Sequence, residues 1–174
     1  MRLSSFLPSL IRICFFWALV FVAPKNSVAN DTILRPARGN SVFTFEFSPL
    51  ARDAYRKIFS LRLSEATTTL AELRRREPNN LIAPLVENYH DFLTVLVNDD
   101  RAEFNRLARN MEPRLARISR GDRKSPWYLF SQAEIRLQWA VLNGKYNAYL
   151  SSLSDIKQAY ALLEQNRKEH PDFM

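Results

Sequence analysis

The sequence predicts an all-α protein in which about three antiparallel helix hairpins stack to form a short solenoid. The chain of 174 residues contains only 3 glycines, although folds with many tight turns use glycine wherever the backbone takes a positive φ. Apolar residues recur every three or four positions through residues 49–174, which is the period of a helix. Helices that are apolar on two sides alternate with helices that are apolar on one side, as stacked hairpins require, whereas a closed bundle gives equal stripes.

The first 29 residues have the pattern of a secretory signal peptide. Arg2 and Arg12 precede an apolar run at residues 13–23, and the small residues Ser27 and Ala29 suit cleavage after residue 29. The run is about half the length of the roughly 20 residues that a membrane-spanning helix needs, which disfavours the alternative of a permanent anchor. We therefore expect export to the periplasm, the cell envelope or the exterior, with cleavage near Ala29.

Cleavage changes both the thiol content and the charge of the chain. Cys14 is the only cysteine and is lost with the signal peptide, so the mature chain has no disulfide, thiol nucleophile or thiolate metal site. Of the 25 Lys and Arg residues, 3 are also lost, which leaves 22 against 18 Asp and Glu and a net charge of +4. This mild excess disfavours nucleic acid as a partner and favours an acidic protein or an anionic envelope surface.

Residues 30–48 form a lead-in without helical periodicity. Pro36 and Gly39 interrupt it, and the alternation that follows puts Phe43, Phe45 and Phe47 on one face of an extended segment. We expect this segment to cover the core beside the first helix pair. The alternative is a strand that pairs with a partner by edge addition.

The first hairpin begins at Ser48 and Pro49, because serine is a good N-cap and proline suits the first helical position. Its first helix has two adjacent apolar stripes, one made of Leu50, Ala54, Ile58 and Leu61 and the other of Tyr55 and Phe59. The second helix, at residues 64–77, ends before Pro78. It has the single stripe Ala66, Leu70 and Leu73.

The second hairpin repeats this alternation. Residues 82–97 are apolar almost all round, and Asn98, Asp99 and Asp100 then begin a helix that is apolar on one side only. Pro113 lies within that helix and predicts a kink or a break, because proline removes a backbone hydrogen bond. The apolar stripe consists of Phe104, Leu107, Met111, Leu115 and Ile118.

The third hairpin opens at Ser125 and Pro126, and its first helix, at residues 127–142, is apolar on most sides. We expect Asn143 and Gly144 to end this helix as its C-cap. The last helix, at residues 146–168, has a regular stripe that we expect to be buried. This stripe consists of Tyr146, Tyr149, Leu153, Ile156, Tyr160 and Leu163.

Apolar residues also occur beside that stripe, at Leu150, Ala161 and Leu162. A solenoid needs a terminal cap with a polar outer face, because every internal hairpin presents apolar surface to its successor. We therefore predict that the chain either lacks further C-terminal repeats or completes its stack by contact with another chain, self-association included. The alternative is that the last helix lies free as a polar cap.

Two segments are similar to the second half of a tetratricopeptide repeat, in which a small residue packs between helices and a proline ends the unit. One segment has Ala66, Leu70, Leu73 and Pro78, and the other has Ala159, Leu163 and Pro171 at the same offsets. The chain therefore resembles the tetratricopeptide-repeat (TPR) family over residues 49–174. The resemblance implies a right-handed stack with a groove for an extended peptide or a helix, and no active site.

Few residues are suited to catalysis. The sequence has none of the common phosphate-binding, nucleophile-elbow or zinc-protease motifs. His90 and His170 are the only histidines, and packing or a helix end explains each better than a role as base or metal ligand. Asp99 and Asp100 are adjacent and suit a helix cap better than a metal site. We predict no catalytic residue, no metal site and no cofactor.

The strongest local charge lies at residues 101–124, where basic residues outnumber acidic ones. The arginines of this basic face, Arg114 included, flank the apolar stripe, so we expect them in solvent. A solvated face can also bind carboxylates, lipid headgroups or anionic glycans. No aromatic residues interleave with these arginines, which disfavours single-stranded nucleic acid.

These patterns predict a non-catalytic, exported scaffold or adaptor that binds a protein or peptide partner through a helical-repeat surface. The alternative function is electrostatic docking on an anionic envelope surface, a lipid headgroup or a glycan, through the basic face at residues 101–124. Salt separates the two, because screening weakens electrostatic docking more than apolar contacts. The candidate contact residues are Tyr55, Phe59, Arg106, Arg109, Arg117 and Arg120.

Overall fold

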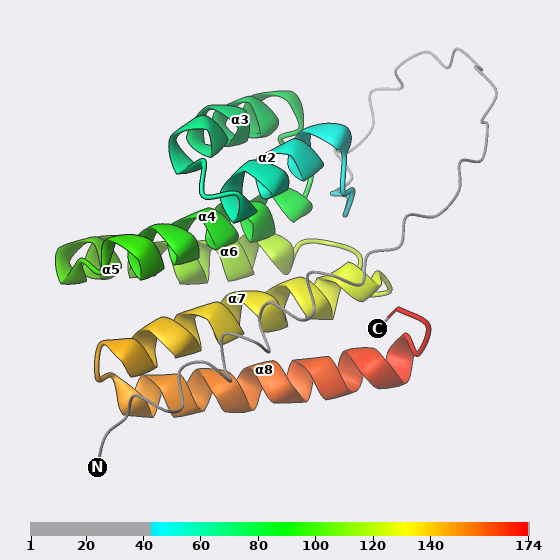
Figure 1. Cartoon of the computed structure of the whole chain (residues 1–174). Helices are drawn as coiled ribbons and strands as arrows, with labels where there is room; N and C mark the ends of the chain where they lie inside the picture. Colours follow the sequence, from blue (N-terminus) through cyan, green and yellow to red (C-terminus); the bar gives the residue numbers. More distant parts are fainter. Residues whose placement is uncertain (1–42, 174) are drawn as a thin grey trace, which may run out of the picture. The chain divides into compact units, whose positions relative to one another are not determined.

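The computed structural model describes residues 43–173, so the expected signal peptide and most of the lead-in lie outside the described residues. The described part is all-helical and contains no β-strand, which confirms the predicted fold class at that level (Figure 1). A short 3-10 segment, Ala108–Asn110, joins α5 to α6. The helices are α2 (Pro49–Phe59), α3 (Leu63–Arg76), α4 (Ile82–Asn98), α5 (Arg101–Leu107), α6 (Met111–Ile118), α7 (Pro126–Lys145) and α8 (Tyr149–Glu169).

Helices that follow one another in the sequence pack in pairs, and α4 lies between the pairs. Helix α2 packs along α3, and α7 packs along α8 (Figure 1). Helix α4 contacts α2 and α3 as well as α6 and α7. It is buried almost all round, as its sequence predicts, and Leu85, Val86 and Val95 are among its fully or almost fully buried side chains.

Two helices begin at the caps that the sequence predicts. Ser48 Oγ accepts a hydrogen bond from the backbone N–H of Ala51 at 3.1 Å, and Pro49 is the first residue of α2. Asp100 Oδ1 accepts from the backbone N–H of Ala102 at 2.7 Å and caps α5. A side-chain oxygen at this position satisfies an amide that has no partner within the helix.

The predicted break around Pro113 is present one turn before the proline. The α-helical hydrogen-bond pattern ends at Leu107, changes to a 3-10 turn over Ala108–Asn110 and resumes at Met111. Proline has no N–H to donate to the carbonyl four residues earlier, and its ring crowds that carbonyl. For Pro113 that carbonyl belongs to Arg109, which lies within the 3-10 turn.

The described end of the lead-in, residues 43–47, lies against the connection between α3 and α4. Thr44 forms a single parallel bridge with Asn80, and the Asn80 side-chain amide donates to Glu46 O at 2.7 Å. Phe45 is half-buried, as the predicted alternation requires. A Cβ added to Gly121 would lie 2.4 Å from Phe45 Cε2, so glycine at this position lets the ring approach the backbone.

The predicted end of the fifth helix at Gly144 is wrong. Helix α7 continues through Asn143 and Gly144 to Lys145, and the positive φ of the turn, 65°, belongs to Asn147. Continuing the helix brings Tyr146 into the core, where its ring stacks on Phe104 with centroids 4.5 Å apart. This burial outweighs the cost of about 1 kcal/mol for a glycine within a helix.

Two expectations about burial are also wrong. Leu61 ends the first predicted stripe but is 57% exposed, because α2 stops at Phe59 and the backbone of Leu61 takes a φ of 57°. In α8 the predicted stripe faces away from α7 over most of its length. The helix instead buries Ser152, Asp155, Ala159 and Asn166.

Candidate interaction surface

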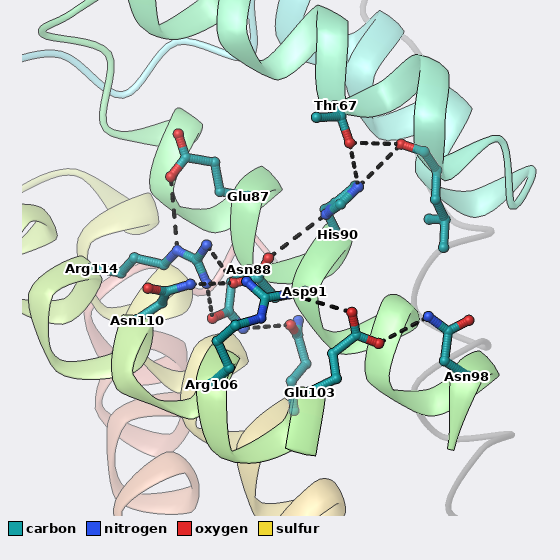
Figure 2. A network of polar contacts seen from close by, with 12 residues as sticks. Thr67, Glu87, Asn88, His90, Asp91, Asn98, Glu103, Arg106, Asn110 and Arg114 are labelled. Carbon is teal, nitrogen blue, oxygen red and sulfur yellow. Dashed lines mark hydrogen bonds and ion pairs between the residues drawn. The ribbon is translucent and has the colours of Figure 1, made fainter. Parts of the chain in front are cut away.

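A buried polar network joins α4 to α6 and is drawn in Figure 2. Arg114 of α6 extends into the core, with its side chain only 11% exposed. Its Nη2 lies 2.7 Å from Asp91 Oδ2, and its Nη1 donates to Asn88 Oδ1 at 3.1 Å. Asn110 donates to the same Asp91 oxygen at 2.8 Å, and Arg114 Nε lies 3.8 Å from Glu87 Oε2. The expectation that Arg114 lies on a solvated face is therefore wrong.

The network continues from α4 into α7. Asn88 is fully buried, and its Oδ1 also accepts from Trp139 Nε1 at 2.9 Å, while its Nδ2 donates to Gln138 Oε1 at 2.7 Å. Glu134 Oε2 accepts from Tyr89 Oη at 2.5 Å. The side chain of Asn88 therefore has partners on both α6 and α7, which fixes α4 between them.

Burial shifts the acidic groups of this network in different directions. Burial alone would raise the pKa of Asp91, but the nearby His90 ring, the charge of Arg114 and the hydrogen bond from Asn110 outweigh it and lower this pKa. For Glu87, burial dominates over the nearby arginines and raises the pKa. Burial also raises the pKa of Glu134. Glu87 and Asp91 share Arg114, and Glu134 binds Tyr89 of α4 from α7, so the network is suited to holding helices together.

His90 is one of these partners. Its Nε2 lies 3.1 Å from both Thr67 Oγ1 and Leu63 O of α3, and its Nδ1 lies 3.7 Å from Asp91 Oδ1 (Figure 2). Both ring nitrogens thus have neighbours, which agrees with a packed histidine. Across residues 43–173, no group of three or more His, Cys, Asp or Glu side chains has a metal-binding arrangement.

Tyr55 and Phe59, two predicted contact residues, are half-buried in an aromatic cluster. Their rings lie 4.4 Å apart, and Tyr89 contacts both, at 5.6 Å from Tyr55 and 5.2 Å from Phe59. Phe47 packs edge-on against Tyr55 at 5.7 Å and stacks on Trp127 at 5.9 Å. Burial, together with the charge of Glu134, raises the pKa of Tyr55 to about 12. These rings contact one another within the fold.

The four predicted arginines do not converge on one site. Arg106 pairs with Glu103 at 3.4 Å, and an Nη of Arg117 donates to the carbonyl of Pro78. Arg120 lies over the Phe43 ring, 6.0 Å from its centroid. Arg109 is exposed and has no ion pair within residues 43–173. Much of the predicted basic face is thus engaged in contacts within the chain.

An open groove of about 580 Å³ lies between the end of the lead-in and the start of α2. Its lining carries both signs of charge, from Glu46 and from Arg52 and Arg56. Arg52 Nε already donates to Phe47 O at 2.8 Å. The groove is open and built from one short stretch of chain, residues 45–56, so it provides a weak basis for recognition.

The outer face of α8 is the largest concentration of exposed apolar side chains that the structure describes. We define it by Tyr149, Leu150, Leu153, Ile156 and Tyr160, which are 52%, 86%, 64%, 43% and 66% exposed. Single exposed apolar residues are common on protein surfaces. Five of them along one face of one helix form a contiguous patch, which is typical of an interaction site.

The inner side of α8 explains why this face is exposed. Ser152 Oγ donates to Ala140 O of α7 at 2.8 Å, and Asp155 accepts from Arg136 and Asn143, both at 3.2 Å. Burial raises the pKa of Asp155, although Arg136 partly offsets the effect. Small and polar residues thus attach α8 to α7 through specific hydrogen bonds, and the apolar stripe points outward.

None of the described helices is both long enough and apolar enough to span a bilayer. No protein-family model, curated protein or solved structure matches the chain.

Proposed function

We propose that this protein is an exported, non-catalytic scaffold that binds a protein partner through the outer face of α8. The observation that carries the proposal is the exposure of five large apolar side chains along one helix of a well-packed chain. Burial of apolar surface drives most protein–protein association. An aromatic and aliphatic patch on a rigid helix is also typical of an interface centre.

We propose further that the helix pairs form a short TPR-like solenoid. Each pair contacts the next, since α2 and α3 pack on α4, and α4 and α6 pack on α7. The internal helices α4 and α7 have the most extensive burial, as expected where a helix has neighbours on both sides. In such a stack the outer face of α8 is the surface to which the next helix would bind.

The test is differential capture from the envelope of the host. Leu153→Glu with Ile156→Glu introduces two charges into the outer face and should abolish capture, because a buried unpaired carboxylate is costly. Ser151→Glu with Gln158→Glu adds the same charge at exposed positions of α8 outside that face and should leave capture unchanged. Equal capture by both variants would refute the proposed surface.

A second candidate function is electrostatic docking on an anionic surface. It is supported by the exposure of Arg109, Arg123 and Lys124, none of which has an ion pair within residues 43–173. Co-sedimentation with vesicles that contain anionic lipid should then fall steeply with salt and with Arg109→Glu and Arg123→Glu. Binding that is absent at low salt would exclude this function.

A further inference from the structure

The apolar residues of α8 have the spacing of a helix that packs along one other helix. Tyr149, Leu153, Ile156, Tyr160 and the half-buried Leu163 are separated by steps of four, three, four and three. This period of 3.5 residues keeps the side chains on one seam when two helices pack at a shallow angle. An extended peptide or a flat surface does not require such a spacing. The face is therefore shaped for a helix.

The exposed area of this face matches a small dimer. The exposed fractions lie between 43% and 86% for the five side chains of the outer face. At about 100 Å² for each side chain, the face offers on the order of 500 Å² of apolar surface. Two copies would bury on the order of 1,000 Å², which is the lower limit for a specific interface. The polar rim would add to this area.

The face is also complementary to itself when two copies of α8 run antiparallel. With the two-fold axis between residues 154 and 155, Tyr149 lies opposite Tyr160 of the second copy, and Leu153 lies opposite Ile156. Leu150, the most exposed of the five, then lies beside the methylene groups of Lys157 of the second copy. This arrangement covers all five apolar residues and places no like charges directly opposite each other.

We infer that the outer face of α8 binds the same face of a second copy of this chain, in an antiparallel, two-fold symmetric dimer. The inference rests on the proposed function, because it names the partner of the surface proposed there. A two-fold dimer uses one patch twice, so every residue of the seam contributes at two places. Each substitution in the seam therefore acts twice.

The first test is sedimentation velocity of the purified protein between about 1 and 500 μM, a range that covers weak association. We expect a reversible monomer–dimer equilibrium. Leu153→Glu should raise the dissociation constant about 100-fold or more, because two unpaired carboxylates would enter the apolar seam. Ser151→Glu with Gln158→Glu is the matched control and should leave the equilibrium unchanged. Circular dichroism at low concentration checks that each variant is folded, as expected for exposed positions.

The second test is disulfide trapping in a Cys14→Ser background, where the chain has no other cysteine. A mixture of Tyr149→Cys and Tyr160→Cys chains should form a mixed disulfide in preference to either homodimer, because the two positions face each other only in the antiparallel register. A parallel pair would instead link Tyr149→Cys to itself and would overturn the stated geometry.

The outcomes separate this inference from the proposed function. A protein that stays monomeric to 500 μM overturns the second copy as partner. If Leu153→Glu with Ile156→Glu still abolishes envelope capture, the proposed function stands with a different protein as occupant. A dimer that Leu153→Glu does not weaken overturns the seam. If capture is then also unaffected, the proposed function fails as well.

Discussion

Replacing Arg114 by leucine should be among the most destabilising single changes in the described fold. The guanidinium lies 2.7 Å from Asp91 and 3.1 Å from Asn88, and both ion-pair partners are about 10% exposed. Leucine would leave Asp91 buried with Asn110 and His90 as its remaining neighbours. Removing one partner of a buried ion pair costs about 3–5 kcal/mol, because the other charge remains desolvated. In a domain of this size the melting temperature should fall by roughly 10–20 °C.

The assay is urea unfolding followed by circular dichroism and tryptophan fluorescence. Arg109→Leu is the matched control, because Arg109 is exposed and has no ion pair in the described residues. It should change the free energy of unfolding by no more than about 0.5 kcal/mol. Asp91→Leu combined with Arg114→Leu should recover a large part of the loss, since removing both charges also removes the unpaired one.

The three variants together decide the role of the network. If Arg114→Leu costs no more than Arg109→Leu, Arg114 is solvated in the folded protein and the buried network is absent. If the double variant is less stable than Arg114→Leu alone, Asp91 contributes stability independently of Arg114. Either result would contradict the account of how α4 is held against α6.

Four further predictions concern single positions. Gly121→Ala should lower the free energy of unfolding by about 1–3 kcal/mol, because the new Cβ would meet Phe45 at 2.4 Å. Gly144→Ala should raise it by about 0.5–1 kcal/mol, since this glycine is helical and a Cβ would be in ordinary contact; thermal melts that shift both variants the same way would contradict this pair. Burial raises the pKa of Glu134 above its unfolded value of about 4.3, so its contribution to stability is complete below that pH and is lost as the pH rises through the folded pKa. Urea melts across pH should show that Glu134→Gln removes this loss of stability at higher pH. If the free energy of unfolding changes with pH equally in the variant and the unmodified protein, the assignment to Glu134 is refuted. Asn166→Leu should raise the free energy of unfolding by about 1 kcal/mol, because both amide atoms are buried without a hydrogen-bond partner in the described residues; a destabilised variant would indicate that the amide is satisfied by water.

The sequence predicts helix existence and helix starts well where the cause is local. A serine before a proline, an aspartate before a helix and a proline within one each act over fewer than five residues, and α2, α5 and the break at Ala108–Asn110 follow from them. The burial of α4 is also predictable, because a helix that is apolar all round has no side that favours water.

The location of side chains that depend on distant partners could not be predicted. Arg114 belongs to a run of arginines that resembles a solvated face, and its burial depends on Asp91 and Asn88, which lie more than twenty positions earlier. The same pattern also predicts that Arg117 is a contact residue, which stays a prediction, and its hydrogen bond to the carbonyl of Pro78 could not be predicted. Charge composition alone does not distinguish these roles from binding to a partner.

Helix α8 shows the limit of periodicity most clearly. An apolar stripe identifies the side of a helix that gains most from burial, but it does not show whether a neighbour is available within the chain. Here the neighbour α7 contacts the polar side, through Ser152 and Asp155. Hydrogen-bonding residues on that side provide specific contacts that a search for apolar residues overlooks.

Because α8 is attached through its polar side, its apolar side chains stay exposed, and they determine how strongly the outer face can associate. Full burial of a large apolar side chain is worth about 1.5–3 kcal/mol, so five partly exposed side chains could contribute on the order of 5 kcal/mol for each copy. Association costs an estimated 4–15 kcal/mol in lost translational and rotational freedom. Two copies together supply about 10 kcal/mol, so at the low end of that cost about 6 kcal/mol remains, which corresponds to a dissociation constant of tens of micromolar. A scaffold with this surface would therefore exchange its partner readily, and its occupancy would depend on local concentration.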